Sequence, residues 1–98
     1  MALEIIDLFR KLIASLSCIE KITTDEKIKN EATKYLIDLT IQYKHFIEFY
    51  DIKSLDFKYT EGEIIDFSNM CIENKENDLV KLGEDIQFAI IDLIKILK

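Results

Sequence analysis

The chain has no proline and only two glycines among its 98 residues. Turn-rich β folds and irregular chains place these two residue types at their turns, so the scarcity of both argues against such folds. Isoleucine, leucine, lysine and glutamate are abundant instead, and this composition favours long helices. We therefore predict an all-α protein.

Cysteine is scarce as well, and the two cysteines, Cys18 and Cys71, are too few for a disulfide framework. Both lie on predicted apolar faces of helices, where a free thiol behaves as a small hydrophobic group. Neither is directly adjacent in sequence to a basic residue or a histidine of the kind that activates a thiol. We expect two buried, unpaired thiols.

The chain also lacks an uninterrupted apolar run of about 20 residues, the length that a membrane-spanning helix needs. Its N-terminal segment carries Glu4 and Asp7 before the first base, Arg10, which is the reverse of a secretory signal peptide. The apolar fraction of 49% is ordinary for a globular protein. These features predict a cytoplasmic protein with one helical domain over residues 1–98.

Apolar residues recur at three- and four-residue spacing in four segments, which indicates four amphipathic helices. The first predicted helix covers about residues 2–21. The second begins at Thr23 and Glu26, which have the spacing of a capping box, and continues to about Tyr50 or Asp51. The pattern lapses over residues 52–59, where we expect a connection with two side chains, Leu55 and Phe57, turned inward.

The spacing of a capping box returns at Thr60 and Glu63, so a short third helix is predicted from there to about Asn74. After a polar turn, Asn77 or Asp78 is expected to cap a last helix with a broad apolar face. Such width is typical of the most buried helix, or of one that continues into a partner. A glycine inside it, at position 83, indicates close helix contact or a slight bend. Four such segments predict an antiparallel bundle of about four helices.

The chain is poor in groups that perform catalysis. Its one histidine, His45, has no cysteine or serine close in sequence to activate. A di-iron bundle would need Glu-x-x-His pairs, but Gln42 stands three residues before His45. Zinc-ligand spacing, calcium-binding loops and phosphate-binding loops are all missing. We predict no catalytic residues, no cofactor and no metal site, and therefore no enzyme activity.

Negative charge is concentrated in one half of the chain. Residues 1–47 hold seven acids and seven bases, whereas residues 48–92 hold twelve acids and four lysines, a net charge of −8. Two lysines in the C-terminal tail bring the total to −6. A field of this sign repels nucleic acid phosphates and attracts basic protein surfaces.

Seven of the ten aromatic residues fall between positions 43 and 67, with acids between them. Helical periodicity predicts that four of these aromatic residues lie in the core: Tyr43, Phe46, Tyr50 and Phe67. Two others, Phe49 and Tyr59, lie off the buried stripe or beside a loop and are expected to meet a partner. Aromatic anchors supply desolvated contact in a protein interface, and the surrounding carboxylates supply steering.

In its small size, its acidic charge and its aromatic and acidic segment, residues 48–78, the chain resembles bacterial toxin-immunity proteins. These include the immunity proteins of bacteriocins and of contact-dependent growth inhibition systems. The resemblance implies a non-catalytic inhibitor whose carboxylates pair with lysines and arginines in the groove of a nuclease toxin. Its leading candidates would be Glu61, Glu63, Asp66, Glu73, Glu76 and Asp78. With the aromatic anchors and the remaining acids, the expected partner-binding set is Glu48, Phe49, Asp51, Asp56, Tyr59, Glu61, Glu63, Asp66, Glu73, Glu76 and Asp78.

A second hypothesis is a structural or adaptor bundle that forms a homo-oligomer through the broad apolar surface of its last helix, residues 79–97. Under the first hypothesis the partner is a basic protein toxin, and neither hypothesis involves nucleic acid or a membrane span.

Overall fold

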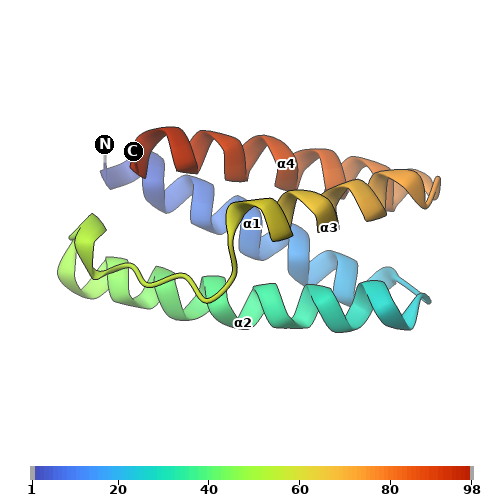
Figure 1. The fold of residues 1–98 in the computed structure, drawn as a ribbon, viewed down its shortest axis with the longest axis horizontal. Coiled ribbons are helices and arrows are strands. Elements are labelled where there is room, and N and C mark those ends of the chain that lie inside the picture. The colour runs from blue at the N-terminus through green and yellow to red at the C-terminus, as the bar shows by residue number, and fades with distance from the viewer. Residues whose placement is uncertain (1, 98) are drawn as a thin grey trace.

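The computed structural model of the chain describes residues 2–97. Four α-helices occur in this part of the chain: α1 (Ala2–Ile22), α2 (Glu26–Phe49), α3 (Glu61–Glu73) and α4 (Asn77–Leu97). A short 3₁₀ helix, η1 (Ile52–Ser54), follows α2, and no strand is found among the described residues. Successive helices run in opposite directions (Figure 1), so the predicted all-α antiparallel bundle is confirmed.

The start of α2 differs from the prediction by two residues. Asp25, not Thr23, caps the helix, because its carboxylate accepts hydrogen bonds from the backbone amides of Lys27 at 2.9 Å and Ile28 at 3.2 Å. Thr23 is buried, and its hydroxyl accepts from the Asp25 amide at 3.1 Å. The predicted capping box at Thr23 and Glu26 is therefore wrong, since a better cap follows it directly.

The predicted capping box of α3 is confirmed. The Thr60 hydroxyl accepts from the Glu63 amide at 3.3 Å, and the Glu63 carboxylate accepts from the Thr60 amide at 2.8 Å. The next helix begins earlier than expected. Asn77 and Asp78, which were expected to precede this helix, both lie within the first turn of α4.

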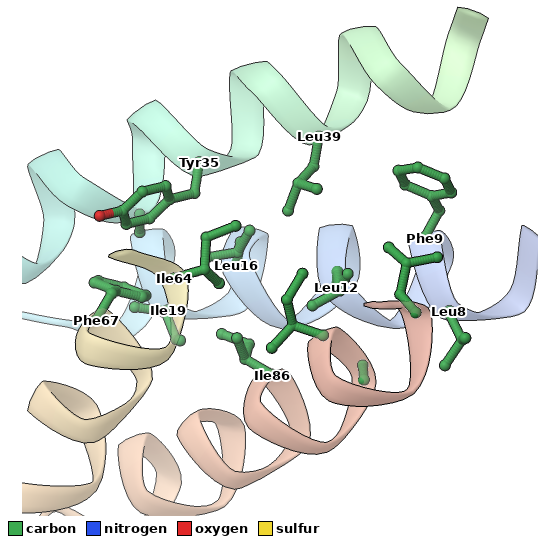
Figure 2. Packing of buried hydrophobic residues seen from close by; sticks show 14 of the residues in the cluster. Leu8, Phe9, Leu12, Leu16, Ile19, Tyr35, Leu39, Ile64, Phe67 and Ile86 are labelled. Carbon is green, nitrogen blue, oxygen red and sulfur yellow. The ribbon is translucent and has the colours of Figure 1, made fainter. Parts of the chain in front are cut away.

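The core runs along the whole bundle and contains side chains from all four helices (Figure 2). Phe9 of α1 is fully buried, and its ring stacks on those of Phe46 and Phe57 at centroid distances of 6.4 and 6.2 Å. Phe67 is also buried, and Tyr43 is partly buried. Both side chains expected to turn inward from the connection, Leu55 and Phe57, pack against this core.

Tyr50 was predicted to be buried, but it is 63% exposed. The helix α2 ends one residue before it, at Phe49. Tyr50 is the C-cap residue and adopts a left-handed backbone with φ 49°, so its side chain leaves the buried stripe. Helices often end with a residue in this conformation.

Gly83 of α4 permits a close approach between α3 and α4, as its position in the sequence suggested. A Cβ atom at position 83 would lie 2.8 Å from the Ser68 carbonyl oxygen and 3.0 Å from the Cβ of Cys71. Real Cβ atoms essentially never lie as close as 2.8 Å to another heavy atom, so any other residue at position 83 would force the two helices to shift. The packing of α3 on α4 therefore depends on this residue.

The two thiols differ in exposure. Cys71 is buried, as predicted, and burial raises the pKa of its thiol to about 11. Cys18 is exposed, so its predicted burial is wrong. The buried stripe of α1 passes through Ser15 and Ile19, which leaves position 18 facing outward.

Candidate protein-binding face

The third helix is too short to cover its neighbour. With a rise of 1.5 Å per residue, the 13 residues of α3 extend about 20 Å, whereas the 21 residues of α4 extend about 31 Å. α3 begins near the middle of the long axis, and the chain between α2 and α3 runs along α2 to reach it (Figure 1). About two turns of α4 near its C-terminal end therefore extend beyond α3 and are not covered by it.

Two buried polar side chains of α2 hold the connection in place. Gln42 forms a pair of hydrogen bonds with the backbone of Asp56: its amide nitrogen donates to the carbonyl at 2.6 Å, and its oxygen accepts from the N–H at 2.7 Å. The Asp38 carboxylate accepts from the Lys58 amide at 3.0 and 3.2 Å. Asp38 and Gln42 are 5% and 4% exposed, so α2 fixes the path of the connection from inside the protein.

Sequence analysis missed this pair, although a signal was present. Asp38 and Gln42 occupy positions of the α2 stripe, between Tyr35 and Phe46, that periodicity assigns to the buried face. Buried polar side chains are almost always hydrogen-bonded. Two polar residues one turn apart on an apolar stripe therefore indicate hydrogen-bond partners in a segment packed against that face.

An apolar groove of about 440 Å³ opens beside the part of α4 that α3 does not cover. Its walls come from the connection, the start of α3 and the last turns of α4: Phe57, Tyr59, Thr60, Glu61, Ile64, Ile90, Leu93, Ile94 and Leu97. Of the described residues that line it, Glu61 is the charged one. Lys58, next to Tyr59 in the chain, lines a different hollow against α2, and its ammonium lies 5.8 Å from the centroid of the Tyr59 ring.

A second hollow, of about 270 Å³, lies on the opposite side of α3, against α2. Three carboxylates line it, those of Glu31, Glu63 and Asp66, together with Tyr35, and within the described part of the chain no lysine or arginine does so. The Tyr35 hydroxyl donates to the Glu63 carbonyl oxygen at 3.4 Å. Burial raises the pKa of Tyr35 to about 12, and the negative charge of Glu31 contributes to the shift. We call this set of residues the acidic hollow.

Glu31 belongs to the half of the chain that has no net charge, so sequence analysis did not select it. It lies in α2 and meets α3 because the two helices are neighbours in the bundle. Only the fold could show that a residue of the neutral half adds to the acidic surface.

Ten of the eleven predicted partner-binding residues are exposed, and Tyr59 is partly buried. They do not form one compact patch. The end of α2, which carries Glu48 and Phe49, and the turn between α3 and α4 lie at opposite ends of the molecule, whose longest extent is 37 Å (Figure 1). The structure divides them by place into an α2-end group (Glu48, Phe49, Asp51), a central group (Asp56, Tyr59, Glu61, Glu63, Asp66) and a turn group (Glu73, Glu76, Asp78).

The two predicted aromatic anchors differ. Phe49 is 60% exposed at the end of α2, as expected of an anchor. Tyr59 packs against the core, with its ring edge-on to that of Tyr35 at a centroid distance of 5.1 Å. Tyr59 is therefore a wall of the groove and does not project into solvent.

Several of the acids also stabilise local structure. Asp51 caps η1 by accepting from the Lys53 amide at 2.9 Å, and Glu63 completes the capping box of α3. Glu61 and Asp78 lie in the first turns of α3 and α4, where a negative charge interacts favourably with the helix dipole. Substitutions that test binding are therefore better placed at Glu31 and Asp66, which cap no helix.

His45 lies on α2 and is partly buried. Within residues 2–97 no group of three or more histidine, cysteine, aspartate or glutamate side chains is arranged to hold a metal ion. None of the helices in this range is both long and apolar enough to cross a membrane.

Comparison of the chain with protein-family models, with curated proteins and with solved structures finds no match.

Proposed function

We propose that the protein is a non-catalytic inhibitor that binds and neutralises a basic protein toxin in the cytoplasm, in the manner of an immunity protein, with a nuclease domain as the expected toxin. The acidic hollow is the observation that favours this function most. It gathers three carboxylates from two helices around one tyrosine, and no lysine or arginine of residues 2–97 lines it. A lysine or arginine from a partner would supply the missing positive charge.

The mechanism of inhibition would be occlusion. A nuclease binds phosphates with lysines and arginines, and carboxylates in a fixed arrangement compete for the same side chains. The net charge of −8 over residues 48–92 would also accelerate the encounter with a basic surface. No group of the inhibitor needs to react, which agrees with a chain that has a single histidine.

Coexpression with the product of the neighbouring gene tests this function. If that product is a basic protein that arrests growth, we expect this chain to relieve the arrest and to form a complex with it. The double substitution Glu31→Lys with Asp66→Lys should weaken the complex at least tenfold and abolish protection. A matched control, Glu84→Lys with Asp85→Lys, makes the same charge change at exposed positions of α4 outside the hollow.

Two results would refute the function. One is a neighbouring product that neither arrests growth nor binds the chain. The other is equal loss of binding in the hollow variant and in the control, because the attraction would then be one of net charge without a site.

Self-association through α4 is a second candidate function, and one observation favours it. Phe88 is 70% exposed on the outer face of α4, and Ile91, one turn further on, is 38% exposed. An adaptor bundle would bury these side chains in a dimer. Light scattering at roughly 10 to 100 µM protein tests this, because weak dimers have dissociation constants of about this size. Dimers that Phe88→Ser dissociates would support this function, and a strict monomer would exclude it.

A further inference from the structure

We infer that the apolar groove and the acidic hollow form one composite site, which holds a segment of a basic protein by an apolar side chain in the groove and a lysine or arginine in the hollow. This inference rests on the proposed function and specifies the recognition that it requires. Neither feature was expected from the sequence.

The groove lies where α3 is too short to cover the C-terminal turns of α4. Gly83 of α4 touches α3, and one turn further along α4 the side chain of Gln87 donates to Asn69 of α3 at 2.8 Å. The same face of α4 continues with Ile90, Ile94 and Leu97, which line the groove beyond the start of α3. An apolar side chain from a partner would therefore cover a surface that α3 covers elsewhere in the bundle.

The apolar groove and the acidic hollow share one wall, the first two turns of α3. Glu61 and Ile64 line the groove, and Glu63 and Phe67 line the acidic hollow. The aromatic rings of the two sites are also in contact, because Tyr59 lines the groove, Tyr35 lines the hollow, and their centroids are 5.1 Å apart. A single extended segment that crosses the start of α3 can therefore reach both sites.

Charge complementarity selects the occupant. A second copy of this chain would bring a net charge of −6 to a surface that is already acidic, and like charges across an interface oppose association. A neutral apolar ligand would fill the groove but leave the carboxylates of the hollow unused. A basic segment with one large apolar side chain satisfies both parts of the site.

Three synthetic peptides test the inference by NMR titration of the whole protein at low salt. The first has four lysines around a central phenylalanine, the second has serine in place of the phenylalanine, and the third has serines in place of the lysines. We expect the first peptide to bind about tenfold more tightly than either of the others, since it alone fills both sites. Its phenylalanine should shift the methyl resonances of Ile94 and Leu97.

Two pairs of variants locate the site. Ile94→Ser should remove the advantage of the phenylalanine peptide over the serine peptide, whereas Ile91→Ser, the same change on the same helix outside the groove, should retain it. Asp66→Lys should weaken both lysine peptides, and Asp85→Lys should affect them less.

The outcomes separate the inference from the proposed function. If both lysine peptides bind equally and Ile94→Ser changes nothing, the groove has no part in recognition, and the inference fails while binding of a basic partner stands. If the lysine-free peptide binds as tightly as the first, the acidic hollow has no part and the composite site is excluded. If no peptide shifts any resonance, the inference and the proposed function both fail.

Discussion

Replacement of Gln42 by methionine tests how the wall of the groove is built. Methionine matches glutamine closely in length and helix propensity, so Gln42→Met removes the amide while keeping most of the packing. Two short hydrogen bonds to the Asp56 backbone, at 2.6 and 2.7 Å, would be lost. Each is worth about 1 kcal/mol, and both bonds are only partly buried, so the full penalty of an unsatisfied buried group is not added. We expect a loss of about 2 kcal/mol in the free energy of unfolding.

For a chain of this size, that loss corresponds to a fall in Tm of roughly 8 to 16 °C, measurable by calorimetry. Hydrogen exchange provides a local readout. The Asp56 amide should lose protection, whereas the amide of Ile64 in α3, which donates to the carbonyl of the N-cap residue Thr60, should keep it. Gln87→Met is the matched control. It breaks a hydrogen bond on the surface and should cost less than about 0.5 kcal/mol. Equal Tm values for the two variants, with unchanged exchange at Asp56, would show that Gln42 does not hold the connection.

Three further predictions concern the helices and the two thiols. Gly83→Ala should destabilise the protein by about 1 to 3 kcal/mol in urea unfolding, because its Cβ would meet the Ser68 carbonyl at 2.8 Å. The control Gly62→Ala, whose nearest neighbour lies at 3.9 Å, should be neutral or stabilising by up to about 1 kcal/mol. Equal effects of the two substitutions would contradict the close packing of α3 on α4. A thiol reagent should modify Cys18 rapidly and Cys71 only after unfolding, and two fast thiols in the native protein would refute the burial of Cys71. The free energy of unfolding should fall as pH rises from 9 to about 12. In the unfolded chain the pKa of Cys71 is near 9 and that of Tyr35 near 10, whereas in the folded protein these pKa values are about 11 and about 12. Constant stability between about pH 8 and 11 would contradict this.

The number and type of helices could be predicted because the information is local. Apolar side chains at three- and four-residue spacing mark the buried faces of all four helices, and the capping box at Thr60 and Glu63 places the start of α3. Gly83 could be interpreted as a close contact because a glycine inside a strongly apolar helix needs a reason.

Boundaries were harder to predict where two local signals compete. Thr23 and Asp25 both suit the N-cap of α2, and in the structure Asp25 takes that position while the Thr23 hydroxyl accepts from the Asp25 amide. Tyr50 continues the stripe of α2 by its spacing, but the helix ends at Phe49. Periodicity alone does not show where a helix stops, so the exposure of Tyr50 could not be predicted.

The site could not be predicted because it depends on contacts between distant segments. The groove results from the unequal lengths of α3 and α4 and from the path that Asp38 and Gln42 give to the connection. The acidic hollow combines Glu31 with two acids more than thirty residues further along the chain. Charge counting found the acidic half of the chain, but it could not find where carboxylates from both halves meet.

The most direct test of binding at the start of α3 is the NMR titration with the peptide of four lysines around a phenylalanine, mapped over the whole protein. We predict saturable shifts that are largest at Thr60, Ile64 and Ile94 around the groove and at Glu63 and Asp66 around the acidic hollow, and that weaken as salt is added. Shifts confined to Phe88 and Ile91 on the outer face of α4, or to the end of α2 near Phe49, would contradict a site at the start of α3.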